Sequence, residues 1–283
     1  MGSALGTIER IWRYPIKSTG GEVLDEAAVD ARGLVGDRLY AVRDAEGKFG
    51  SGKNTRRFRR MPGLLRLRSR YPGGATTRLP ELLDPDGEPV PDPTAYMRRY
   101  LNRGDVEVAR EEAVSHFDQL PVSLLTTATL DWVRAAVPGV PVDERRFRPN
   151  LLVRTPPGTP AFVEDEWFGS TARVGDTLRL RFERSSERCA MTNEAQQDLP
   201  PPRGSCAPSR RHTTCGWTHW PRSRNRDAYG SGTPSNCSEP RPMSSASAVV
   251  GLRHQPSRHL VIGLRCLVCR PLPCPVRPPP YAA

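Results

Sequence analysis

Residues 173–184, RVGDTLRLRFER, alternate apolar and charged side chains after one turn signal. Leu178, Leu180 and Phe182 recur at every second position, which is the period of a strand that buries one face. The stretch LLRLRSR at 64–70 shows the same alternation of leucine and arginine. Short strands of this kind, separated by Gly, Pro and Asp, predict a mainly β chain with some helix, an α+β class built as an antiparallel barrel or sandwich.

Other strand-like runs carry the same punctuation. The run RLYAVRD at 38–44 ends in Asp-Ala-Glu-Gly, which is a plausible hairpin turn. Buried or half-buried strands are also expected at 5–15, 23–30, 121–126 and 146–155.

Two segments show helical signals instead. One helix is expected at 92–101, where Asp92 can serve as N-cap before a proline in the first turn. The other covers ATLDWVRAAV at 128–137, with Thr127 or Thr129 near its N-cap.

The charge of the chain is unevenly distributed. The whole sequence carries 42 Lys and Arg against 31 Asp and Glu, a net of +11, which would suit a nucleic-acid-binding protein. Residues 1–199, however, hold 30 basic and 29 acidic side chains, whereas residues 200–283 hold 12 Arg, no Lys and two acids. The basicity belongs to the C-terminal part, so we expect no specific nucleic-acid partner.

Cysteine follows the same division. Six of the seven cysteines lie after residue 200, and only Cys189 lies in the body. A body with one cysteine forms no internal disulfide, which fits a reducing compartment. The N-terminus MGSALGTIER lacks a signal-peptide pattern, and no apolar run approaches the roughly 20 residues that span a bilayer. We expect a cytoplasmic protein with no membrane partner.

Residues 200–283 differ in kind from the rest. They contain 15 Pro and many Arg, Ser and Cys, without a sustained strand or helix period. Such a composition buries too little apolar surface to offset chain entropy, which predicts a disordered tail. A GC-rich gene read out of frame also gives this composition, and we hypothesise a frameshift product. The Cys and His spacings here match no zinc or iron–sulfur pattern.

Two motifs in residues 1–199 resemble functional motifs but are better explained by structural or simple anion-binding roles. The segment GKFGSGKNT at 47–55 nearly matches a phosphate-binding loop, but Asn54 stands where a hydroxyl would hold magnesium. Because a turn precedes it, nucleotide hydrolysis is disfavoured, although Lys53 and the backbone could contact an anion. The acidic run EDEW at 164–167 could cap a turn or hold an arginine, and it has too few oxygens for a divalent cation.

Cationic and hydroxyl side chains gather in a third place. The motif YPIKS at 14–18 is followed by GLVGDR at 33–38. Lys17, Ser18 and Arg38 offer a cation, a hydroxyl and a planar fork, which suit a phosphate or carboxylate ligand. A solvated strand end explains the same residues without any ligand.

The motif RFRPN at 146–150 adds two arginines and an amide. On a strand, alternation would put Arg146, Arg148 and Asn150 on one face, which would suit a polyanionic ligand. The exposed face of an edge strand explains the pattern equally well.

The lone cysteine of the body has two interpretations. Cys189 follows the last strand and a neighbouring arginine, Arg188, favours its thiolate, the form that binds a soft metal. A buried, inert cysteine is the alternative.

Taken in order, the motifs YPIKS, GLVGDR, SGKN, RFRPNLLV, FVEDEW, VGD and RC–T resemble the MOSC family with its N-terminal β-barrel domain. Bacterial MOSC proteins and the mitochondrial amidoxime-reducing components belong to this family. The resemblance covers about residues 5–198. It implies an N-terminal β-barrel domain at 1–118 and a MOSC domain at 119–199. The MOSC barrel is expected to be incomplete, because the strands that close it in the family would fall in the tail.

The resemblance also implies a molybdenum cofactor, a molybdopterin. In the family a cysteine supplies a thiolate to molybdenum, and Cys189 matches it as the catalytic and metal-binding residue. The cofactor contacts carried over from the family fall on Lys17, Ser18, Arg38, Arg146, Arg148 and Asn150, and on Thr126 and Thr127 in place of a family hydroxyl motif.

The activity implied is that of an oxidoreductase that reduces small N-hydroxylated or N-oxide compounds. An external donor protein, a flavin or iron–sulfur reductase, would supply electrons, because the chain shows no motif for either group. One alternative is a non-catalytic carrier of sulfur or of the cofactor. Another is an inactive truncated product whose basic tail binds anions. The pyridoxal-phosphate part of molybdenum cofactor sulfurases, which gave the family its name, has no counterpart here.

Overall fold

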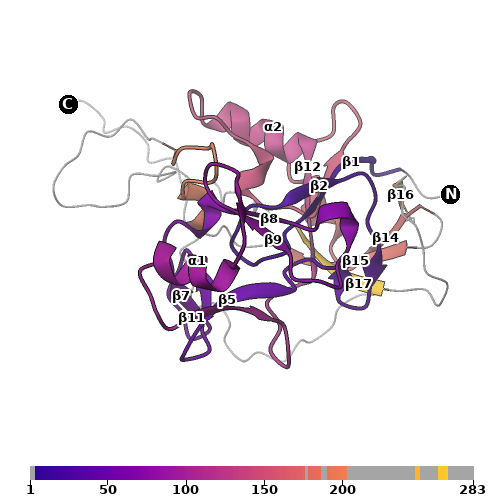
Figure 1. Ribbon diagram of the computed structural model, residues 1–283. Coiled ribbons are helices and arrows are strands. Elements are labelled where there is room, and N and C mark those ends of the chain that lie inside the picture. The colour runs from indigo at the N-terminus through magenta and orange to yellow at the C-terminus, as the bar shows by residue number, and fades with distance from the viewer. Residues whose placement is uncertain (1–3, 176–177, 186–189, 203–245, 249–260, 267–283) are drawn as a thin grey trace, which may run out of the picture.

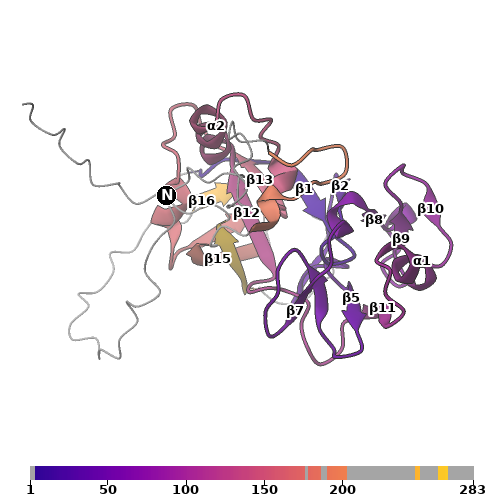
Figure 2. The same ribbon diagram turned by 90° about the vertical axis from the view of Figure 1, so that its left-hand side faces the viewer.

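The computed structural model describes residues 4–175, 178–185, 190–202, 246–248 and 261–266. Strands predominate in these residues, which also hold two α-helices. The mainly β, α+β class is therefore confirmed. Figure 2 shows two lobes, with most of the purple strands in one and the pink later strands in the other, and the indigo first strand reaches from the second lobe towards the first.

The first lobe is built from short strands in two small sheets. One sheet has the order β11 (Val106–Arg110), β5 (Tyr40–Asp44), β6 (Phe49–Ser51) and β7 (Phe58–Arg60). The other has the order β10 (Pro89–Val90), β9 (Glu81–Leu83) and β8 (Arg68–Arg70). The predicted hairpin turn after β5 is confirmed, since Gly47 N donates to Asp44 O at 2.8 Å.

The second lobe contains one larger sheet, with eight strands among the described residues. Its order is β16 (Ala246–Ala248), β14 (Thr171–Val174), β15 (Leu178–Ser185), β17 (Val261–Cys266), β12 (Val122–Thr126), β13 (Leu151–Arg154), β1 (Thr7–Arg13) and β2 (Glu22–Leu24). The ribbon β3 (Val29–Asp30) and β4 (Gly33–Leu34) follows β2. Ile11 pairs with both Leu151 and Leu24, so the first strand of the chain belongs to the sheet of the second lobe.

Two segments of the tail form strands, although we expected no regular structure after residue 199. Strand β17 lies between β12 and β15 and runs parallel to both, and it is the yellow strand beside β15 in Figure 1. Without it, β12 and β15 would each present an unpaired edge. The sequence VIGLRC has the β-branched and apolar residues that suit this position.

Both predicted helices form. Helix α1 (Pro93–Tyr100) begins after Asp92, whose side chain accepts from Ala95 N at 3.0 Å, which confirms the predicted cap. Helix α2 (Thr127–Ala136) is capped by Thr126, one residue before the predicted cap candidates. Its hydroxyl accepts from Thr129 N at 3.2 Å.

Three expected strands differ in the structure. The expected strand at 146–155 begins only at Leu151, because η3 (Glu144–Arg146) and a turn precede it. The prediction that Arg146, Arg148 and Asn150 share one strand face is therefore wrong. Pro149 removes a ladder donor and disfavours the regular backbone of the residue before it. In the other two cases, 64–70 splits into η1 (Leu64–Arg66) and β8, and 23–30 splits into β2 and β3.

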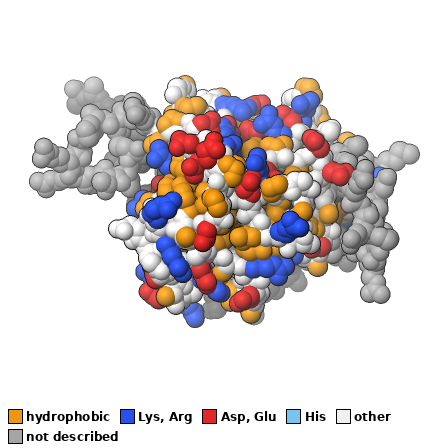
Figure 3. Space-filling view, viewed as in Figure 1, with side chains coloured by type: hydrophobic (Ala, Val, Ile, Leu, Met, Phe, Trp, Pro, Cys, Tyr) orange, Lys and Arg blue, Asp and Glu red, His pale blue; other side chains and the backbone are white. Residues whose placement is uncertain are grey.

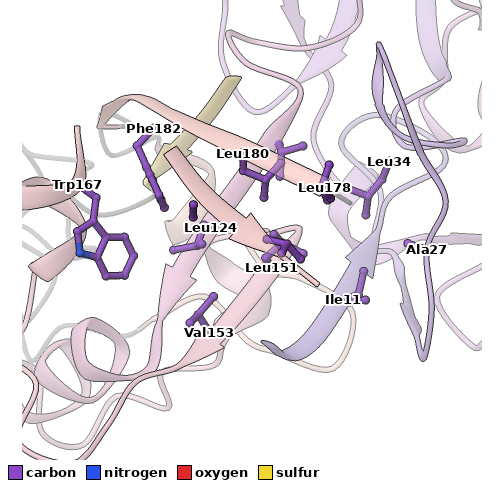
Figure 4. Close-up of a cluster of buried hydrophobic side chains, with 13 residues drawn as sticks. Ile11, Ala27, Leu34, Leu124, Leu151, Val153, Trp167, Leu178, Leu180 and Phe182 are labelled. Carbon is purple, nitrogen blue, oxygen red and sulfur yellow. The ribbon is translucent and has the colours of Figure 1, made fainter. Parts of the chain in front are cut away.

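A buried apolar cluster holds the second lobe together. The predicted inward alternation of Leu178, Leu180 and Phe182 is confirmed, and the ring of Phe182 lies edge-on to Trp167 at 5.1 Å. Figure 4 shows these side chains meeting others from β1, β12 and β13. Each large apolar side chain buried in this way contributes about 1.5–3 kcal/mol. The remaining short helices are η2 (Pro72–Gly74), η4 (Val163–Trp167) and η5 (Ala190–Asn193).

Candidate functional site

The loop after β1 passes from the large sheet to the first lobe. Lys17 N donates to Tyr40 O at 2.8 Å, and Arg38 N donates to Tyr14 O at 2.7 Å. These bonds hold the loop alongside the segment that enters β5. The motifs YPIKS and GLVGDR, distant in sequence, are thereby brought together between the lobes.

Two guanidinium groups lie against the ring of Tyr14. The Cζ atom of Arg148 is 4.2 Å from the ring centroid and that of Arg38 is 4.8 Å from it. The phenol donates to Pro149 O at 3.1 Å, and burial raises its pKa, so Tyr14 stays neutral. Arg38 also pairs with the buried Asp37. The cation–π contacts and the ion pair fix both guanidinium groups in place.

Asn150 connects this cluster to the strands. Its Oδ1 accepts from Arg38 Nη1 at 3.2 Å and from the backbone N and the hydroxyl of Ser123 at 3.1 and 3.0 Å. Its Nδ2 donates to Trp12 O at 3.1 Å. One buried amide thus links β1, β12 and the guanidinium of Arg38.

One of the two terminal nitrogens of Arg148 has no hydrogen-bond partner among the described residues. Its Nη1 donates to Thr19 O at 2.5 Å, whereas its Nη2 is buried and has no partner among the described residues. Burial lowers the pKa of Arg148 to about 10, so the group remains charged at neutral pH. A buried donor without an acceptor costs about 1–3 kcal/mol. The Nη2 atom therefore marks a place where an acceptor such as an oxyanion would bind.

Three candidate residues share an unusual backbone conformation. The φ angles of Ser18, Arg38 and Arg148 are 65°, 49° and 55°, in the left-handed region. Only six non-glycine residues in the described part of the chain have a positive φ. Each such residue costs about 1 kcal/mol or more, and such strain concentrates at functional sites.

A second cationic group lies on the ring of Phe58. The Nζ atoms of Lys17 and Lys53 are 4.8 and 5.0 Å from its centroid. Both lysines pair with Asp118, Lys53 at 3.3 Å. One carboxylate therefore serves two ammonium groups, of which that of Lys17 is buried.

Cations outnumber acids across the two groups. Four cations, Lys17, Lys53, Arg38 and Arg148, accompany two carboxylates, Asp37 and Asp118. On the molecular face in Figure 3, by contrast, basic and acidic side chains are interspersed. The local excess of positive charge favours an anionic ligand at the junction of the lobes.

The chain that follows Cys189 returns to this junction. Met191 of η5 and Ser18 line the same cavity of about 20 Å³, and the Sδ atom of Met191 is 3.6 Å from Ser51 Oγ. Ser18 Oγ donates to Gly50 O at 2.9 Å. Cys189 itself lies outside the described residues, so its position as a metal ligand stays a prediction.

Three other predicted residues have separate surroundings. Arg146 is buried and donates to Pro200 O at 2.6 Å, which anchors the chain after η5. Thr126 donates to Glu164 at 2.7 Å, and Thr127 lies 3.2 Å from Thr155 Oγ1. None of these contacts joins them to Arg38 or Arg148, and the cofactor roles given to them stay predictions.

The structure also places the acidic run at 164–167 and the glycine-rich segment at 47–55. In EDEW, Glu164 accepts from the backbone N of Thr126 at 3.1 Å and from Thr129 Oγ1 at 2.7 Å, so it binds the start of helix α2 and not a turn. The segment 47–55 forms β6, which pairs antiparallel with β5, and a loop that leads to β7. A phosphate-binding loop instead joins a parallel strand to a helix.

Sequence reasoning missed Tyr14, His116 and Asp118 as members of the site. Tyr14 lies in the motif YPIKS and could have been included with it, whereas no local pattern distinguishes Asp118. His116 Nδ1 lies 3.0 Å from Arg38 O, and burial lowers its pKa to about 4, so the ring is neutral at pH 7.

Two features are absent from the described residues. No three His, Cys, Asp or Glu side chains within these ranges gather in an arrangement that would hold a metal ion. None of the helices in the described part combines the length and hydropathy that crossing a bilayer requires.

The structure described so far is that of a mainly β protein with a cationic, partly strained cluster of side chains between two lobes. Comparison with family models identifies the class more closely. The MOSC N-terminal beta barrel domain matches residues 5–119, and the MOSC domain matches residues 111–226. The chain thus belongs to the MOSC family, whose domain is associated with the molybdenum cofactor and resembles the C-terminal part of molybdenum cofactor sulfurases. No curated protein matches it.

Proposed function

We propose that the chain binds the molybdenum cofactor between its lobes and reduces N-hydroxylated or N-oxide compounds. The observation that carries the proposal is the buried, unpartnered Nη2 of Arg148 inside a cation-rich cluster. A molybdopterin bears a phosphate, and a guanidinium fork suits such a group. The residues present therefore fit the cofactor.

The side chains have distinct roles in this proposal. Lys17, Arg38 and Arg148 would hold the anionic part of the cofactor, and Ser18 would add a hydroxyl. Asn150 positions Arg38 through the 3.2 Å bond. When bound, the cofactor supplies two-electron oxygen-atom chemistry at its metal, with the protein setting orientation and electrostatics.

Cys189 is the proposed thiolate ligand. The support is its sequence position two residues before Met191, which lies beside Ser18 and Ser51. The excess of cations around Lys17 and Arg38 would favour a thiolate nearby. Electrons are proposed to come from a flavin or iron–sulfur reductase acting as a separate partner.

Molybdenum analysis combined with a turnover assay tests the proposal. The purified full-length chain should contain molybdenum and reduce benzamidoxime with an artificial electron donor. Molybdenum without turnover would indicate a carrier of sulfur or cofactor in place of an enzyme, an interpretation that the sulfurase-like family relationship would favour. A chain without molybdenum that binds nucleic acid in a salt-sensitive manner would instead support the inactive, basic product.

Matched variants test the residues. Arg148→Gln should lower molybdenum content about tenfold or more, because it removes the donor fork. Arg154→Gln makes the same charge change at an exposed position of β13 and should leave the content unchanged. Cys189→Ala should abolish turnover, and retained activity would exclude this cysteine as the ligand.

A further inference from the structure

A second concavity lies apart from the cationic site. It is a groove of about 350 Å³, within the size range of small-molecule sites. None of the cluster residues Lys17, Arg38 and Arg148 lines it. Its polar lining comes from both lobes and includes Trp12, Glu22, Arg68, Arg70, Arg145 and Gln197.

Most charges in this groove already have partners. Arg70 donates to Glu81 at 2.5 Å, and Arg145 donates to Asp143 at 2.8 Å. Glu22 accepts from an arginine of β1 at 2.8 Å. These pairs neutralise one another, so they leave little net charge for a ligand.

Arg68 is the exception among the charged residues. It forms no ion pair or side-chain hydrogen bond within the ranges that the structure describes, and its charge only adds to the hydrogen bond from Arg145 in lowering the pKa of Asp198. Its side chain is exposed, and its Nη2 lies 2.7 Å from where a Cβ on Gly87 would stand. The guanidinium therefore lies against this turn at the groove, and its donors remain available.

Trp12 contributes a second donor that has no partner among the described residues. This donor is the Nε1 of a side chain that lines the groove and is more than nine-tenths buried. A buried indole N–H normally has an acceptor. Val23 and Leu83 line the same groove and add apolar surface.

We propose that this groove binds a small organic molecule that carries one carboxylate. One unpaired guanidinium matches a single negative charge, and a carboxylate has enough lone pairs to accept from both Arg68 and Trp12. The apolar lining suits the organic part of the ligand. This site is separate from the proposed cofactor site and goes beyond the proposed function.

Titration followed by NMR tests the site on the full-length protein. The indole N–H resonance of Trp12 is assigned by its loss in Trp12→Phe. Adding benzoate should shift this resonance, and the titration should give a dissociation constant of about 1 mM or below. Uncharged benzamide, which has nearly the same shape, should leave it unmoved. The readout is independent of molybdenum content, so it distinguishes failure of this site from failure of the cofactor proposal.

Two arginine variants complete the test. Arg68→Gln should weaken benzoate binding about tenfold, whereas Arg66→Gln, the same change at an exposed residue outside the groove, should not weaken it. Absence of a shift would overturn the proposal. Equal shifts with benzamide, stronger binding of inorganic phosphate, or equal weakening in both variants would also overturn a carboxylate site.

Discussion

Replacing Asn150 by alanine should strongly destabilise the protein. The buried amide makes four side-chain hydrogen bonds, three to its oxygen and one from its nitrogen. At about 1 kcal/mol for each bond, Asn150→Ala should cost about 4 kcal/mol. Since domains are stable by about 5–15 kcal/mol, this is a large fraction of the total. For a chain of this size the melting temperature should fall by roughly 10 °C.

Ser123→Ala provides the graded comparison. It removes a hydroxyl that donates to Asn150 at 3.0 Å but leaves the bonds of the amide to Arg38 and Trp12. The expected loss is about 1–2 kcal/mol. Urea unfolding of wild type and both variants measures the series. A loss below about 1 kcal/mol for Asn150→Ala, or equal losses for the two variants, would refute the role assigned to the amide.

Three further predictions concern stability. Burial lowers the pKa of His116 from about 6.5 to about 4, so as the pH falls the imidazole is protonated in the unfolded chain before it is protonated in the folded one. The contribution of His116 to stability is therefore complete above about pH 6.5 and should decline towards pH 4. Urea titrations of His116→Gln should lack that part of the decline, and an unchanged slope would contradict the assignment. Glu164→Gln should cost about 2 kcal/mol in the same assay, because one of two accepting oxygens is lost, while the exposed Glu166→Gln should be neutral. Gly20→Ala should destabilise by about 1 kcal/mol, since its Cβ would lie 1.8 Å from Gln197 Nε2, and adding Gln197→Ala should remove this penalty; additive losses would exclude the clash.

Local signals predicted much of the fold. The period-two pattern of Leu178, Leu180 and Phe182 located a buried strand face, and Asp92 located the start of α1. These features depend on neighbours in sequence, where propensity and capping act directly. The strand β17 was not predicted, because its pairing with β12 and β15 depends on edges supplied by distant residues.

The site was predicted in part for the same reason. Eight residues were named as cofactor contacts, and the structure brings together the segments of five of them: Lys17, Ser18, Arg38, Arg148 and Asn150. Arg146, Thr126 and Thr127, named with them, have other partners. The expected strand geometry at 146–150 was wrong because a proline and a left-handed residue interrupt the alternation. Partners such as His116 and Asp118 come from elsewhere in the chain, and single-residue signals do not reveal them.

Because β1 belongs to the sheet of the second lobe, it must wait during synthesis for a partner strand from much later in the chain. Trp12 and Asn150, which hydrogen-bond across this sheet, are 138 residues apart in the chain. At about 5–20 residues per second, a ribosome needs roughly 7 to 28 s to deliver the second after the first. During that interval the nascent N-terminal strand has no lasting partner from β13. Chaperones that shield exposed strand edges should therefore matter more to the yield of this protein than to that of one whose lobes fold in succession.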